Sequence, residues 1–97
     1  MGFTVWPDGV GGDVLCSIHN ERARQEELRR QGKFPHTCAS VVLSHAEKFA
    51  ILGEEFGEVA RHVTEGVIDP ARVDVMKLRE ELIQVAAVAA GWAESLS

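Results

Sequence analysis

Acidic residues gather on two segments that are both rich in helix formers. In LGEEFGEVARHV, at residues 52–63, the acids are Glu54, Glu55 and Glu58. In LREELIQVAAVAAGW, at residues 78–92, Glu81 is followed three positions later by Gln84. Carboxylates crowded beside apolar residues repel one another, so they take up a proton or require a cation. All-oxygen ligand sets suit Mg²⁺ or Mn²⁺, which also bind substrate phosphates.

Helical geometry brings these polar residues to the edge of an apolar stripe on each helix. The stripe of the first helix consists of Leu52, Phe56, Val59 and Val63. At about 100° per residue, Glu55 lies about 40° from Val59, and Glu81 stands in the same relation to Val85. Gln84 lies one turn along from Glu81. If the two helices pack antiparallel, both polar sets meet in one pocket.

Two other readings of these residues stay open. An isolated acidic cluster is usually a solvated helix face, here neutralised by Lys48, Arg61 or His62. A second acid-bearing helix weakens this alternative without excluding it. A small metal-binding bundle without hydrolysis is the other alternative, and it would use the acids or a set of possible zinc ligands. That set comprises Cys16, His19, His36 and Cys38.

The elements that must position the acids are predicted to be helices. Residues 1–13 contain four glycines and a proline and are predicted to be flexible or extended, whereas residues 14–97 form a single all-α domain. Helices are expected at 14–31, from Thr37 or Ser40 to Gly66, and from Asp69 or Asp74 to about Glu94. Residues 82–93 are apolar on almost every side. We therefore expect an all-α bundle of three to four helices completed by oligomerisation.

Composition limits the function classes that the chain can serve. Its 97 residues carry a net charge of −5, which argues against nucleic-acid binding through bulk electrostatics. No uncharged apolar run reaches the length of a membrane span, and no targeting signature is present. A cytoplasmic protein with no membrane partner, and with its two cysteines reduced, is expected.

Together, the two acid-bearing segments resemble the MazG-like all-α nucleoside triphosphate pyrophosphohydrolases, whose signature is ExxE on one helix and ExxD on the next. Glu55 and Glu58 match the first pair, and Glu81 matches the first acid of the second. Gln84 stands where the family has Asp, so one negative ligand is missing. The similarity covers roughly residues 37–96. The stretch NERARQEELRRQGKF also resembles the amino-terminal helix of small, phage-type members.

The resemblance implies hydrolysis of a (deoxy)nucleoside triphosphate to the monophosphate and pyrophosphate, including guanine deoxynucleotides in nucleotide-pool control. It also implies a homo-oligomer, dimeric or tetrameric. The expected Mg²⁺ or Mn²⁺ ligands are Glu55, Glu58, Glu81 and Gln84. Glu54 is the candidate general base, with Glu55 also catalytic. Lys48, Arg61 and Lys77 are expected to bind phosphates.

A non-catalytic helical oligomerisation or interaction module with a surface acidic face is the principal alternative function. Base recognition is not assigned by the sequence. Trp92 lies on an apolar stripe, which is more typical of a core residue than of a base-stacking one. Candidate hydrogen-bond donors on the first helix are Asn20, Arg22 and Gln25.

Overall fold

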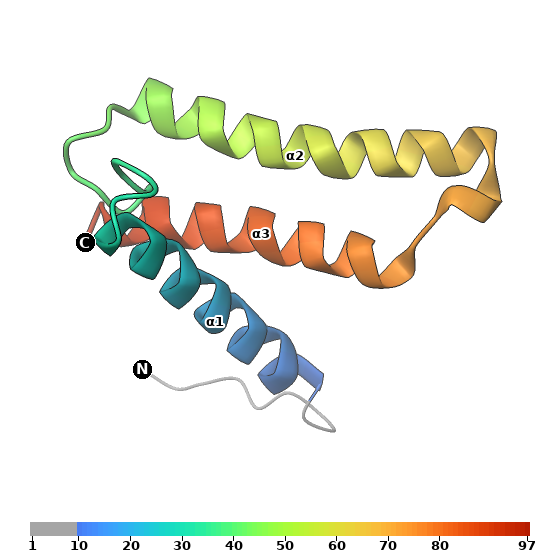
Figure 1. Ribbon diagram of the computed structural model, residues 1–97, viewed down its shortest axis with the longest axis horizontal. Coiled ribbons are helices and arrows are strands. Elements are labelled where there is room, and N and C mark those ends of the chain that lie inside the picture. The colour runs from blue at the N-terminus through green and yellow to red at the C-terminus, as the bar shows by residue number, and fades with distance from the viewer. Residues whose placement is uncertain (1–9) are drawn as a thin grey trace.

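A computed structural model describes residues 10–97 as three α-helices and one short 3-10 helix, without a strand in that range (Figure 1). The elements are α1 (Val10–Arg30), α2 (His45–Ile68), η2 (Pro70–Arg72) and α3 (Val75–Glu94). The predicted all-α class is confirmed. None of the helices in this range combines the length and the apolar character needed to cross a bilayer.

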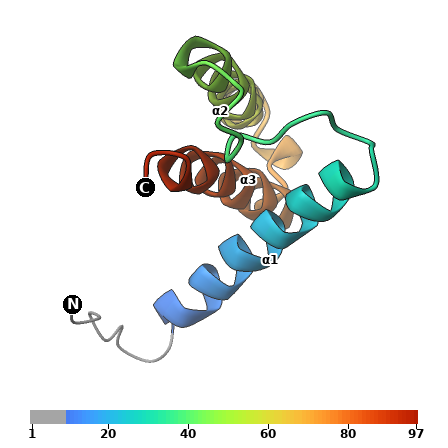
Figure 2. The ribbon, with the colours of Figure 1, turned by 90° about the vertical axis from the view of Figure 1, so that its left-hand side faces the viewer.

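Helix α3 is the common packing partner of the other two helices. After the turn that contains η2, helix α3 runs back along α2, and α1 crosses α3 obliquely (Figures 1 and 2). Helices α1 and α2 both pack against α3, whereas the backbones of α1 and α2 do not approach each other closely within the described range. Side chains from all three helices therefore border the space between α1 and α2.

Helix α1 ends where the sequence predicts and begins earlier. Gly32 adopts a φ of 80°, a left-handed conformation that suits glycine. The amide groups of Gly32 and Lys33 donate to the carbonyls of Arg29 and Leu28, which satisfies the end of the helix as a Schellman motif. Residues 10–13, predicted to be extended, belong to α1. The rest of the predicted extended segment lies outside the described residues.

Helix α2 begins later than the sequence predicts and is one continuous helix. Its N-cap is Ser44, whose hydroxyl accepts from the amide of Glu47 while the Glu47 carboxylate accepts from the Ser44 amide. The predicted caps were wrong because both hydroxyls have other partners. Thr37 donates to the Glu26 carboxylate, and Ser40 accepts from the amide of Val42 in a local turn.

The connection from α2 to α3 uses both predicted acidic caps. The carboxylate of Asp69 accepts from the amide of Ala71, so Asp69 and Pro70 begin only η2. The carboxylate of Asp74 accepts from the amide of Lys77 and caps α3. The choice that the sequence left open between these starts is settled in favour of Asp74.

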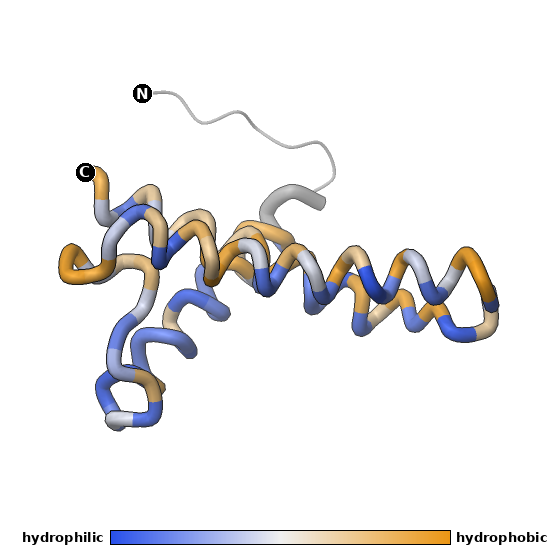
Figure 3. The backbone as a smooth tube through the Cα atoms, turned by 90° about the horizontal axis from the view of Figure 1, so that it is seen from above, coloured by the Kyte–Doolittle hydropathy of each residue, from blue (hydrophilic) through white to orange (hydrophobic). Residues whose placement is uncertain are grey.

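The interior of the chain contains few apolar side chains. Its buried apolar residues are Cys38, Ala87 and Val88, and its buried polar residues are Arg22, Thr37, Lys48 and His62. The predicted inward stripe of α2 is only partly correct, since Phe56 is 64% exposed and Val63 is 50% exposed. Apolar residues recur along α2 and α3, whereas the second half of α1 is mainly hydrophilic (Figure 3). Much of the apolar surface of residues 10–97 is therefore not covered by other residues in that range.

Candidate functional site

Cavity A lies between α1, α2 and α3 and has a volume of about 630 Å³. All three glutamates of the α2 cluster line it, and Gln84 enters it from α3. The lining also includes the apolar residues Phe34, Pro35, Leu43, Ile51 and Val88. The structure thus brings together four of the predicted site residues beside a surface suited to a ring or an alkyl group.

Glu55 is the acid most affected by its surroundings. Partial burial raises the pKa of this carboxyl above its ordinary value, and the neighbouring charges of Glu58, Glu21 and Glu54 raise it further. The positive charge of Arg24 opposes these effects without reversing them. Glu55 therefore lies in a locally negative region, where a bound cation would be favoured.

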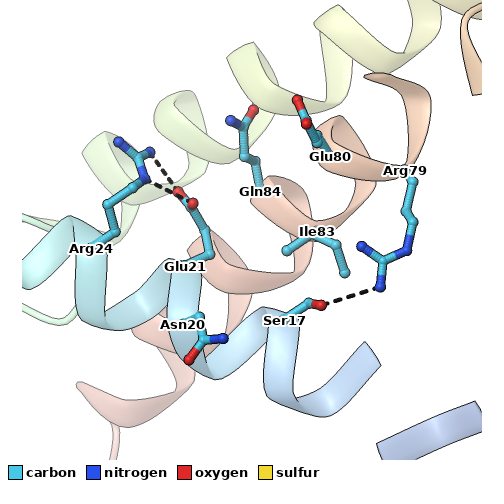
Figure 4. A pocket seen from close by; sticks show the side chains of 8 residues that line it. All are labelled: Ser17, Asn20, Glu21, Arg24, Arg79, Glu80, Ile83 and Gln84. Carbon is cyan, nitrogen blue, oxygen red and sulfur yellow. Dashed lines mark hydrogen bonds and ion pairs between the residues drawn. The ribbon is translucent and has the colours of Figure 1, made fainter. Parts of the chain in front are cut away.

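Arg24 cannot neutralise Glu55 fully because it is engaged by Glu21. The Arg24 Nε and Nη2 atoms donate to the two Glu21 carboxylate oxygens at 2.9 and 2.6 Å. These hydrogen bonds hold the pKa of Glu21 below its ordinary value. The pair also lines cavity C, of about 460 Å³, with the side chain of Gln84 on the α3 side (Figure 4). Cavities A and C thus share Glu21, Arg24 and Gln84.

The remainder of cavity C is formed by α1 and α3. Figure 4 shows Arg79 extending from α3 toward α1, where its Nη2 atom donates to the Ser17 hydroxyl at 3.1 Å. The same atom lies 3.1 Å from the Asp13 carboxylate. The side chain of Arg79 is therefore held by Ser17 and Asp13 of α1. Glu80 also lines this cavity and does not line cavity A.

Cavity B, of about 240 Å³, lies between α2 and the start of α3. It brings Glu58 and Glu81 together with two of the predicted phosphate ligands, Arg61 and Lys77. Both basic side chains belong to exposed residues. Glu58 lines cavity A as well as cavity B, so it is the point where the two cavities adjoin.

Glu81 is bonded to a histidine that links α2 to α3. The His62 Nδ1 atom lies 2.6 Å from Glu81 Oε1, and the side chains are only 9% and 12% exposed. The Asp74 amide donates to the other ring nitrogen, Nε2, at 3.1 Å. Both ring nitrogens of His62 are therefore occupied, and one Glu81 oxygen is committed.

The predicted metal ligands are divided between the two cavities. Glu55, Glu58 and Gln84 line cavity A, whereas Glu58 and Glu81 line cavity B. Within residues 10–97, no three His, Cys, Asp or Glu side chains converge closely enough to hold a metal ion as they stand. The donor chemistry nevertheless fits a hard divalent cation, because the set offers only oxygens and includes the uncompensated Glu55.

Lys48, a predicted phosphate ligand, and Trp92, which was considered for base recognition, do not line these cavities. Lys48 is 2% exposed, and its Nζ atom donates to the Ser95 hydroxyl at 2.6 Å, so the structure does not bring it to the acids. Trp92 donates from Nε1 to His45 Nδ1 at 3.1 Å and stacks on that ring. Neither side chain faces the cavity that contains Glu55.

The glutamates of the α2 cluster are not neutralised by nearby basic side chains of residues 10–97, as the alternative of an ordinary solvated helix face would require. In the part of the chain that the structure describes, Glu54, Glu55 and Glu58 form no ion pair with any basic side chain. Of the possible zinc ligands, Cys16 is exposed and Cys38 is buried, and both are free thiols. The charge of the cluster is thus left to solvent or to a ligand.

Sequence reasoning missed the contributions of α1 and of His62 to this region. Glu21 adds a fourth carboxylate near Glu55, although its spacing to Arg24 suggested only an ordinary helical ion pair. His62 was considered as a partner of the α2 acids and instead bonds Glu81. The position of His62 one turn after Glu58 was the available signal, but the helix wheel did not show that it turns toward α3.

Comparisons with family models, characterised proteins and solved structures gave no match to this chain.

Proposed function

We propose that the protein is a metal-dependent (deoxy)nucleoside triphosphate pyrophosphohydrolase that releases the nucleoside monophosphate and pyrophosphate. The observation that carries this proposal is the gathering of Glu54, Glu55, Glu58 and Gln84 in one cavity of ligand size. Partial burial there, together with the charges of neighbouring acids, raises the pKa of Glu55. Such repulsion favours a bound cation, and the family resemblance of the same residues supplies the reaction class.

The acids have distinct roles in this proposal. Glu55, Glu58 and Glu81, with the amide oxygen of Gln84, would hold Mg²⁺ or Mn²⁺. The bound cation would neutralise phosphate charge and lower the pKa of a water molecule. Glu54 is exposed and lines cavity A, so its carboxylate is free to accept the proton of the attacking water. The water oxygen bonds to phosphorus, the bridging bond between the α and β phosphates breaks, and pyrophosphate leaves.

The two adjoining cavities suggest how a nucleotide would lie. Arg61 and Lys77 in cavity B would contact the phosphate oxygens near Glu58 and Glu81. The apolar lining residues of cavity A, which include Phe34 and Ile51, offer a surface for the base. A nucleotide that extends from cavity A to cavity B would pass Glu58, where the two cavities meet.

The proposed enzyme is a homo-oligomer. On α2, Phe49, Phe56 and Val63 recur every seventh residue and are 66%, 64% and 50% exposed. Residues seven apart lie on one face of a helix, so these side chains form a continuous apolar stripe. The interior of a single chain is small, and burying this stripe against a second copy would supply the missing apolar contact.

Nucleotide hydrolysis tests the proposal with matched charge variants. We expect the wild-type protein with Mg²⁺ or Mn²⁺ to convert at least one ribo- or deoxyribonucleoside triphosphate to the monophosphate. Glu55→Gln and Glu81→Gln should lose most of this activity, because each removes a charged ligand and changes little in volume. Glu27→Gln is the control, since Glu27 lies on α1 and bonds only Arg30 and Gln31. Full activity in both test variants would refute the proposal.

The exposed apolar stripe also favours a second candidate, a non-catalytic oligomerisation module. In that case the acids would have no metal to bind. Divalent cations should then leave the melting temperature unchanged, whereas a metal-dependent hydrolase should melt at a higher temperature in Mn²⁺ than in a chelator. The two candidates therefore differ in a measurement that needs no substrate.

A further inference from the structure

His62 makes two contacts that fix both the orientation and the charge of its ring. Because the Asp74 amide donates to Nε2, this nitrogen carries no proton. The remaining ring proton then lies on Nδ1, which donates to Glu81 Oε1 at 2.6 Å. The ring is therefore the neutral Nδ1–H tautomer, held from one side by the backbone at the start of α3 and from the other by Glu81.

A neutral hydrogen-bond donor orients a largely buried carboxylate without cancelling its negative charge. Glu81 is 12% exposed, so its charge requires a hydrogen-bond partner. A lysine or arginine in this place would neutralise the carboxylate, whereas the uncharged His62 orients it and leaves its negative charge available to a cation. Oxygen Oε2 makes no hydrogen bond within the described range, so it is the atom left for a ligand.

We propose that His62 is a positioning residue for Glu81, which it holds in a fixed orientation with one carboxylate oxygen left free, so that Glu81 could serve as a ligand of a divalent cation. This inference rests on the proposed metal-dependent function and adds a residue that the acidic motif does not contain. It also explains why a histidine is buried between α2 and α3 beside cavity B. His62 acts through Glu81 and is not itself a ligand or a catalytic group.

Mn²⁺ titration without nucleotide, followed by electron paramagnetic resonance, tests the role of His62 apart from turnover. His62→Phe removes the donor and should weaken Mn²⁺ binding about 10- to 100-fold, the usual effect of losing an outer-shell partner. His62→Asn places an N–H near the position of Nδ1 and should stay within about fivefold of wild type, since only the bond to Asp74 is lost. His19→Asn, on the exposed surface of α1, should bind as wild type does.

The outcomes distinguish this inference from the proposed function. If the wild type binds Mn²⁺ and His62→Phe binds it equally well, the positioning role is refuted while the proposed function stands. Equal weakening in His62→Phe and His62→Asn would also refute it, because the donor would not be responsible. Failure of the wild type to bind Mn²⁺ would contradict both proposals.

A measurement on the metal-free wild-type protein provides an independent check. Nitrogen-15 NMR of the histidine rings should show the His62 proton on Nδ1 and none on Nε2 at neutral pH. Glu81→Gln replaces the carboxylate acceptor and should shift the His62 Nδ1 resonance more than that of His19. A proton on Nε2 in the wild type would overturn the inference.

Discussion

At the scale of single residues, Glu55 shows that the acidic cluster carries uncompensated charge. Its pKa is raised by burial and by three neighbouring acids, so the folded state binds a proton at Glu55 more tightly than the unfolded chain does. Stability from this group is therefore present at low pH and is lost as the pH rises through the raised pKa. In a chelator at pH 7, we expect Glu55→Gln to have a higher free energy of unfolding than wild type, with a smaller difference near pH 5. Urea denaturation at the two pH values measures this.

Glu27→Gln provides a control of opposite sign. Hydrogen bonds from Arg30 and Gln31 hold the pKa of Glu27 below its ordinary value. Its carboxylate therefore favours the folded state at neutral pH, and this contribution is lost as the pH falls through the lowered pKa. Glu27→Gln should leave the protein unchanged or slightly less stable at pH 7. A Glu55→Gln variant that is less stable than wild type at pH 7 would contradict the account of the cluster.

At the scale of elements, α2 closely approaches the connection before α3 at Gly66 and Val73. A side chain on Gly66 would collide with Val73, whereas one on Gly57, in the same helix, would meet nothing. We expect Gly66→Ala to lower the free energy of unfolding by about 1–3 kcal/mol, as overpacking does. Gly57→Ala should raise it by about 0.5–1 kcal/mol, since alanine is the better helix former. Urea denaturation of both variants measures the contrast.

Removal of the colliding side chain tests the cause of this effect. In the Val73→Ala variant the space beside Gly66 is open. Adding Gly66→Ala to that variant should therefore lower the free energy of unfolding much less than Gly66→Ala does in the wild type. Equal costs in the two backgrounds would show that the collision between Gly66 and Val73 is not responsible.

At the scale of the whole molecule, the apolar stripe of Phe49, Phe56 and Val63 on α2 is exposed and is not covered by the rest of residues 10–97. We expect the wild type to be oligomeric, and Phe56→Gln to shift it toward the monomer because Phe56 lies at the centre of the stripe. Light scattering after size exclusion measures the mass. Val41→Gln is the matched control, since Val41 is 84% exposed but lies in the connection before α2. A monomeric wild type, or the same shift in both variants, would contradict this assignment.

The helices and many of the residues that begin or end them could be predicted from the sequence, because capping and helix termination depend on residues that are close in sequence. Gly32 ends α1 as predicted, and Asp74 is one of the two predicted starts of α3. Thr37 failed as a cap because its hydroxyl bonds Glu26, eleven residues away in sequence. Such a tertiary contact has no signature in the surrounding residues.

The candidate site was predictable only where helical spacing decides it. The grouping of Glu55 and Glu58 follows from their positions on one turn of α2, and it is present in cavity A. The burial of Lys48 and His62 could not be predicted from the helical wheel. The predicted stripe of Leu52, Phe56, Val59 and Val63 suggested a different inward face. Polar residues that turn toward α3 in place of Phe56 reverse the usual rule that apolar residues are buried.

Phosphorus-31 NMR of the protein mixed with a nucleoside triphosphate and Mg²⁺ is a direct test of the proposed pyrophosphohydrolase activity. We expect the three phosphate resonances of at least one substrate to be replaced by those of a nucleoside monophosphate and pyrophosphate, and Glu55→Gln to leave the substrate unchanged. Release of orthophosphate and the diphosphate, or no reaction with any ribo- or deoxyribonucleoside triphosphate, would contradict it.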